Sequence, residues 1–126
     1  MKKIALLAAC AAFAATPAFA DLAGELATAQ THAGMAAKAA DLKTAQMHLH
    51  HAVNCLVGSG GQGYDSSNAN PCAKAGKGAL ADANGDEKAK IQAAVADAEP
   101  GLAPTADLAT VQKSAQATAD AIANAK

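Results

Sequence analysis

Alanine dominates every segment of this chain except the loops, and this feature restricts the fold more than any other. Alanine is the best helix-forming residue. The sparse large apolar residues also repeat at helical intervals, since Leu49, Val53 and Leu56 are spaced i, i+4 and i+7. No segment alternates with the period of two that is typical of a strand, and aromatic residues make up only 2% of the chain. The sequence therefore predicts an all-α protein.

The helix boundaries are marked by capping and breaking residues. Asp41 is a good N-cap that divides one long helical pattern into two, and Pro100–Gly101 is expected to stop a third helix. Thr105 is the expected N-cap of a fourth, with Asp107 in its first turn. The predicted helices are Leu22–Ala39, Leu42–Val57, Glu87–Glu99 and Ala106–Ala125, with a short helical turn possible around Ala79–Ala83.

The links between these helices indicate how they are arranged. Short links place consecutive helices side by side and antiparallel, so about four helices suggest a small up-down bundle. One alternative stays open, a single unbroken helix from Leu22 to Val57. Alanine-lined faces bury little apolar area, so we expect a thin core that needs further stabilisation.

The segment from Gly58 to Cys72 is a loop by its composition of glycine, serine, asparagine and proline. Gly58 is well placed as the C-cap of the helix before it. Cys55 and Cys72 flank the loop, and we expect them to form a disulfide worth about 3 kcal/mol in the chain-entropy treatment. The alternative is that both serve as thiolate ligands of a metal.

The first twenty residues have the pattern of a secretory signal peptide. Lys2 and Lys3 precede an apolar stretch, Ile4–Ala15, and the segment ends in Ala-Phe-Ala. We therefore expect residues 1–20 to be removed and residues 21–126 to form one alanine-rich helical domain, periplasmic or secreted. The apolar stretch is too short for a membrane anchor. Lipidation at Cys10, in the sequence Leu-Ala-Ala-Cys, is the competing interpretation.

The charge of the expected mature chain excludes some partners. Losing Lys2 and Lys3 from ten basic residues leaves eight against eleven acidic ones, a weakly acidic balance. The basic residues are all lysine, and Tyr64 would be the one aromatic residue left. These features argue against binding to nucleic acid and to an anionic membrane surface.

The histidines are the most specific functional signal in the chain. All four lie between positions 32 and 51. His48 and His51 are three residues apart and share one helix face, whereas His50 points elsewhere. Two imidazoles at such a spacing on a helix are a known arrangement for metal binding. A hairpin about Asp41 would add ligands from the preceding helix by placing His32 opposite His50 and, in the same way, Met35 opposite Met47.

The candidate ligands indicate which metals suit the site. Imidazole binds copper, zinc and nickel, and methionine sulfur favours copper, above all Cu(I). No carboxylate lies within the cluster, which argues against a di-iron site, magnesium or calcium. Haem is disfavoured because large apolar residues are scarce and no haem-attachment motif is present. The candidate metal ligands are His48, His51, His32, His50, Met47 and Met35.

These observations lead to two functional hypotheses. The first is a small periplasmic protein that binds a transition metal, with copper favoured, for sequestration, delivery or sensing. The second is an envelope structural or protein-interaction module whose histidines are incidental or respond to pH. We expect no enzymatic activity, since no serine has a recognisable catalytic base and the acidic residues are scattered along solvated helix faces.

Overall fold

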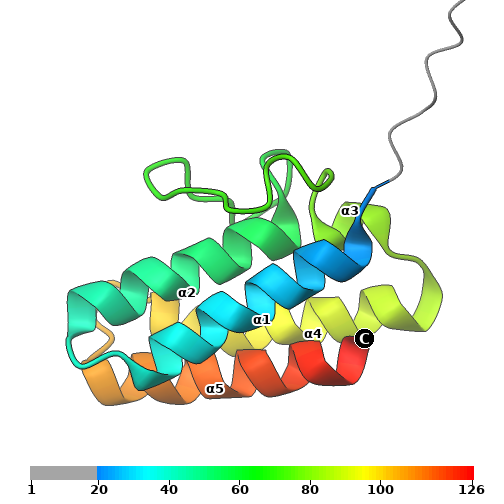
Figure 1. Cartoon of the computed structure of the whole chain (residues 1–126). Coiled ribbons are helices and arrows are strands. Elements are labelled where there is room, and N and C mark those ends of the chain that lie inside the picture. Colours follow the sequence, from blue (N-terminus) through cyan, green and yellow to red (C-terminus); the bar gives the residue numbers. More distant parts are fainter. Residues whose placement is uncertain (1–19) are drawn as a thin grey trace, which may run out of the picture.

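The computed structural model describes residues 20–126, and every regular element in that range is helical (Figure 1). The five helices are α1 (Leu22–Lys38), α2 (Leu42–Val57), α3 (Ala79–Asp82), α4 (Gly85–Leu102) and α5 (Leu108–Ala125). The all-α prediction is confirmed for these residues, with the short α3 added to the four long helices. Apart from Ala20, the expected signal peptide lies outside the described residues, and so does Cys10.

The four long helices form an up-down bundle. α1 and α2 make one antiparallel pair and α4 and α5 make another, while α1 also packs against α5 and α2 against α4. The short α3 contacts α1, α2 and α4 at one end of the bundle. Figure 1 shows the loop between α2 and α3 lying over α2 before it reaches α3 beside the start of α1. None of the described helices has both the length and the apolar character needed to cross a bilayer.

The boundary between α1 and α2 is set by an aspartate cap. The backbone N–H of Thr44 donates to Oδ1 of Asp41 at 2.9 Å, which satisfies one of the free amides at the start of α2. α1 ends at Lys38, and Ala39 leaves the helix in an extended conformation. Residues 22–57 therefore form a hairpin, and the alternative of one unbroken helix is wrong.

The end of α4 differs from the prediction, because the helix continues through Pro100 to Leu102. A proline in the last turn removes only one hydrogen bond, and tertiary packing compensates for its loss. Gly101 is buried, and a Cβ there would lie 2.7 Å from Cδ2 of Leu49 and 2.9 Å from Cβ of Ser114. The absence of a side chain at this glycine lets the end of α4 lie against α2 and α5.

The start of α5 also differs by two residues from the prediction. The N-cap is Asp107, whose Oδ1 accepts a hydrogen bond from the N–H of Thr110 at 2.8 Å, and the helix begins at Leu108. Thr105 lies in the link before it. Both residue types cap helices well, so local sequence did not distinguish between them.

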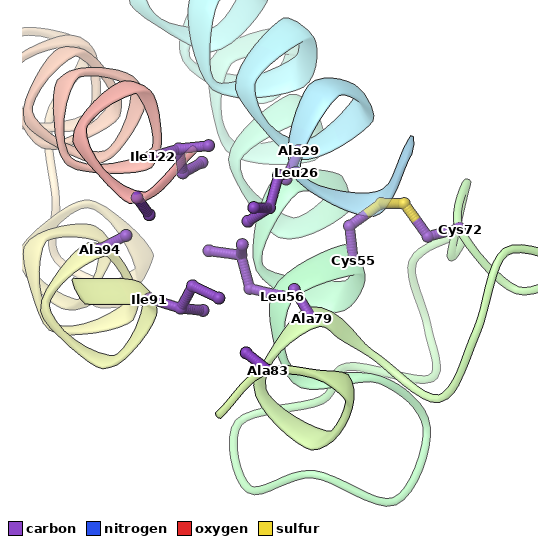
Figure 2. Close-up of a cluster of buried hydrophobic side chains, with 11 residues drawn as sticks. Leu26, Ala29, Cys55, Leu56, Cys72, Ala79, Ala83, Ile91, Ala94 and Ile122 are labelled. Carbon is purple, nitrogen blue, oxygen red and sulfur yellow. A yellow bond between two sulfur atoms is a disulfide. The ribbon is translucent and has the colours of Figure 1, made fainter. Parts of the chain in front are cut away.

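The core is assembled from a few large side chains and many alanines. Leu26, Leu56, Ile91 and Ile122, one from each long helix, point toward one another beside the disulfide (Figure 2). A second cluster lies nearer the opposite end and includes Leu49, Val53 and Val111. Between α1, α2 and α5, Ala33, Ala52 and Ala119 form a third. With so few large side chains, the core is as thin as the composition predicts.

The loop after α2 is tied to the bundle at both ends. The predicted disulfide between Cys55 and Cys72 is confirmed, with a sequence separation of 17. Gly58 is the C-cap of α2 with φ of 68°, a left-handed conformation that glycine adopts without strain. A side chain on Gly58 would overlap the carbonyl of Lys77, so the two ends of the loop meet closely at this point.

Candidate metal centre

Three of the four histidines come together between α1 and α2. His32 is on α1, and His48 and His51 are on one face of α2, as their spacing predicts. Each offers one ring nitrogen, and these three nitrogens all lie within 4.8 Å of one another. We refer to His32, His48 and His51 as the histidine triad. All three side chains are half-buried, so the triad is open to solvent on one side.

The rings of the histidine triad are packed closely. The centroid of the His32 ring lies 5.4 Å from that of His48 and 5.1 Å from that of His51. The centroids of His48 and His51 are 5.8 Å apart, with the ring planes nearly perpendicular at 86°. The shortest contact joins Nδ1 of His32 to Nδ1 of His48 at 3.2 Å. In neutral imidazoles one of these nitrogens would donate and the other accept, depending on the tautomer, and a metal ion bound by both would require each ring to carry its proton on the other nitrogen.

The register of the hairpin differs from the one expected. His32 lies opposite His48 and not opposite His50, because the link between α1 and α2 is centred on Ala40 and not on Asp41. A shift of the turn by one residue moves each cross-helix pairing by two. The predicted pair of His32 with His50 is therefore wrong, whereas the gathering of histidines from both helices is confirmed.

His50 lies away from the triad, on the side of α2 that faces the long loop. Its Nδ1 is 3.3 Å from Oδ2 of Asp65, and the two side chains are 24% and 31% exposed. The pKa of Asp65 is lowered to about 2, first by its hydrogen bonds with Ser67 and then by one with Asn68, with His50 contributing least. His50 therefore serves as a contact between α2 and the loop.

Burial and mutual repulsion favour the neutral form, which binds metal, in two members of the triad, His32 and His51. The pKa of His32 is lowered from 6.5, first by desolvation and then by His51 and His48. The pKa of His51 is lowered too, first by desolvation and then by His48 and His50. Nδ1 of His51 is buried without a hydrogen-bond partner in the protein. Neutral imidazole is the ligand form of histidine, so these two residues need not lose a proton to bind a metal at neutral pH.

The remaining sulfur-containing residues have different roles. Met35 and Met47 are 46% and 39% exposed, and with Leu42 they are the large apolar side chains that the described chain leaves exposed. Met35 is one turn after His32, and Met47 is one turn before His51. Both thioethers therefore lie on helix segments that flank the triad. Cys55 is in the disulfide and is not available as a thiolate ligand.

Two polar residues to which the sequence pattern assigned no role, Asn54 and Glu25, are buried in the structure. Asn54 is 0% exposed, and its side chain binds the backbone of the loop through Asp65, Asn68 and Ala69. Glu25 is also 0% exposed and lies under the end of the same loop. Asn54 follows His50 by one turn, which is a weak signal for a shared face. Nothing near Glu25 in the sequence distinguishes it from an exposed glutamate in the first turn of a helix.

No match was found when the chain was compared with models of protein families, with curated proteins and with solved structures. The function of the histidine triad is therefore inferred from its own geometry and chemistry.

Proposed function

We propose that this protein binds a transition-metal ion through His32, His48 and His51. The observation that carries the proposal is the convergence of three imidazole nitrogens from two helices within 4.8 Å. Two ligands at the usual Zn–N bond length in a tetrahedral site are roughly 3.3 Å apart. The separation of 3.2 Å between Nδ1 of His32 and Nδ1 of His48 already matches this spacing. The third nitrogen lies within 4.8 Å of the other two, so its ring has to move closer to complete the site around an ion.

The openness of the triad supports exchange of the metal. Structural zinc sites are closed by four protein ligands, whereas three ligands leave one position for water or another donor. The three side chains are half-buried, so a bound ion would remain accessible from solvent. Sequestration or delivery of the ion suits this arrangement better than a permanent structural role.

The flanking methionines favour copper as the ion. Thioether sulfur is a soft ligand that selects Cu(I), while imidazole alone also suits zinc and nickel. Met35 and Met47 are exposed on the two helix segments that flank the triad, so neither side chain is fixed in the core. We therefore place Cu(I) first and zinc or nickel next.

An exported location is part of the same proposal. The N-terminal pattern of two lysines, an apolar stretch and Ala-Phe-Ala is that of a signal peptide. A disulfide between Cys55 and Cys72 agrees with an oxidising compartment such as the periplasm. Edman or mass-spectrometric analysis of the secreted form should give Asp21 as the first residue. A chain that keeps residues 1–20 would contradict export through this segment.

A metal titration with two matched variants tests the proposal. The purified protein is titrated with Cu(I), Cu(II), Zn(II) and Ni(II) at pH 7 and pH 5, beside the variant His48→Ala/His51→Ala. We expect one ion per chain at pH 7, with affinity lowered at least about a hundredfold in the double variant and weakened in acid, because protons compete for the same nitrogens. His50→Ala is the control, since His50 contacts Asp65 outside the triad, and it should bind as the unchanged protein does.

The same titration decides between the two hypotheses. If the protein binds no ion more tightly than the double variant, the histidine triad is not a metal site. The competing hypothesis, a structural or protein-interaction module of the envelope, would then account for the chain better. A Met35→Leu/Met47→Leu variant decides the choice of metal, because it should weaken binding of Cu(I) and leave Zn(II) unaffected.

A further inference from the structure

A second titratable site lies at the other end of α1, around the side chain of Glu25. This side chain is 0% exposed, although glutamate is almost never fully buried unless it is paired. Oε1 of Glu25 accepts a hydrogen bond from the N–H of Gly78 at 2.9 Å, but Oε2 is buried with no partner. An ionised carboxylate with an unsatisfied buried oxygen is costly, so the site needs a proton or a cation at Oε2.

The groups that face Glu25 are acidic. Asp82 from α3 lies beside it, and a side chain on Gly76 would overlap both carboxyl groups, which places them against the same glycine. Asp21, the N-cap of α1, adds a further negative charge. Lys77 contributes its backbone N–H to Asp82 at 2.8 Å, whereas its side chain is exposed. The ion pairs found within residues 20–126 do not include Glu25.

We propose that Glu25 is protonated and shares this proton with Asp82, so that the carboxyl pair holds residues 76–82 on the first turn of α1. We call this pair the carboxyl latch. When Glu25 loses the proton to solvent, its buried carboxylate faces that of Asp82, which is half-buried. The segment that carries Asp82, Gly76–Asp82, then separates from α1.

The electrostatics of the site support the carboxyl latch. The pKa of Glu25 is raised from 4.5 to about 7, first by desolvation, while the hydrogen bond from Gly78 opposes the rise and Asp82 and Asp21 add to it. A raised pKa means that the closed form binds a proton that the open form releases. The latch is therefore at full strength below about pH 4.5 and weakens as the pH rises toward 7.

The structure of the loop indicates what the latch controls. Residues 76–78 approach the C-cap of α2 at Gly58, and Asp21 N–H donates to the carbonyl of Ala75 at 2.8 Å. The disulfide holds the loop at Cys72, so an open latch frees only the segment that follows it. The four long helices, which have their own core contacts, should stay folded during this opening.

Hydrogen exchange on the whole protein tests the carboxyl latch without any variant. The amides to follow are Gly78, which binds Glu25, and Lys77, which binds Asp82. After correction for the intrinsic pH dependence of exchange, their protection should fall about a hundredfold between pH 5 and pH 7 and then level off. Carbon NMR of the Glu25 carboxyl group should show a midpoint near pH 7. A midpoint near 4.5 would overturn the proposal.

Two variants separate the latch from ordinary loop mobility. Glu25→Gln keeps an acceptor for Gly78 and places an amide N–H₂ where the proton would be, so protection should no longer depend on pH. Glu99→Gln, at an exposed position on α4, is the matched control and should behave as the unchanged protein does. Equal pH dependence in Glu25→Gln and the unchanged protein would rule the latch out. So would protection that responds to added Ca²⁺ and not to pH, because a cation would then occupy Oε2.

Discussion

Glu25 and His32 lie seven residues apart on the same helix, and burial pushes their pKa values in opposite directions. Desolvation is the largest cause in both cases, and it favours the neutral form of each side chain. For Glu25 the neutral form carries a proton, whereas for His32 it lacks one. The neighbours then strengthen each shift, since carboxyl groups surround Glu25 and imidazoles surround His32.

The opposite shifts have opposite consequences for stability. A raised carboxyl pKa makes the contribution of Glu25 fall as the pH rises from 4.5 to about 7. The lowered pKa values of His32 and His51 make their contribution fall as the pH drops below the ordinary imidazole value of 6.5. In the metal-free protein the two contributions therefore oppose each other as the pH falls below 6.5. The two sites differ in access as well, because Glu25 is fully buried and the triad is partly open.

Removing the disulfide should have the largest effect on stability and should affect the two sites differently. A Cys55→Ala/Cys72→Ala variant is expected to lose about 3 kcal/mol of unfolding free energy, because the disulfide no longer restricts the unfolded chain. The loop at the carboxyl latch should lose protection at Gly78. Urea unfolding and hydrogen exchange measure these two effects. Zinc affinity at the triad should change less than about threefold, and a much larger loss would show that the two ends are coupled.

Glu25→Gln should have the next largest effect, and its sign should depend on pH. At pH 8 the variant should be more stable than the unchanged protein by roughly 2–3 kcal/mol, since the unchanged protein must then keep an ionised carboxylate buried near Asp82 whereas the amide stays neutral. At pH 4 the two proteins should be equally stable within error. Thermal or urea unfolding at both pH values tests this. A variant that is less stable at pH 8 would mean that the ionised carboxylate of Glu25 stabilises the folded protein, so that its pKa is not raised on folding.

Metal binding at the histidine triad should stabilise the protein independently of Glu25. With free Zn(II) at ten times its dissociation constant, unfolding free energy should rise by about 1.4 kcal/mol. The same increment is expected in Glu25→Gln, because among the described residues no hydrogen bond or ring contact joins the Glu25 side chain to the triad. Unfolding with and without Zn(II) measures it, and His48→Ala/His51→Ala should show no increment. An increment that survives in this double variant would place the metal elsewhere.

His50→Ala should have the smallest effect of the four changes. Its contact with Asp65 joins two side chains that are 24% and 31% exposed, and exposed ion pairs contribute little. Melting temperature should change by about 3 °C or less. Calorimetry checks this value. A large drop would mean that His50 and Asn54 together hold the loop, and a His50→Gln variant, which keeps a hydrogen-bonding group, would then restore part of the loss.

The features of this fold that could be predicted from the sequence are those set by contacts between residues close together in the chain. Asp41 and Gly58 mark the ends of α2 through contacts with residues three or four positions away, and both were identified from the sequence. The end of α4 was misplaced because Gly101 is held by Leu49 and Ser114 on other helices. The partner of His32 was misplaced because a one-residue shift in the turn changes the pairing across the hairpin.

The sequence by itself determined the helices, the disulfide and the shared face of His48 and His51, because each depends on helix propensity or on the repeat of 3.6 residues per turn. Only the tertiary structure decided that His32 joins them, that His50 does not, and that Glu25 is buried against Asp82. These outcomes depend on how helices distant in the sequence are aligned. That alignment is set by many small packing contacts. Because an alanine-rich sequence repeats the same side chain at most of them, the sequence alone does not distinguish one alignment from another.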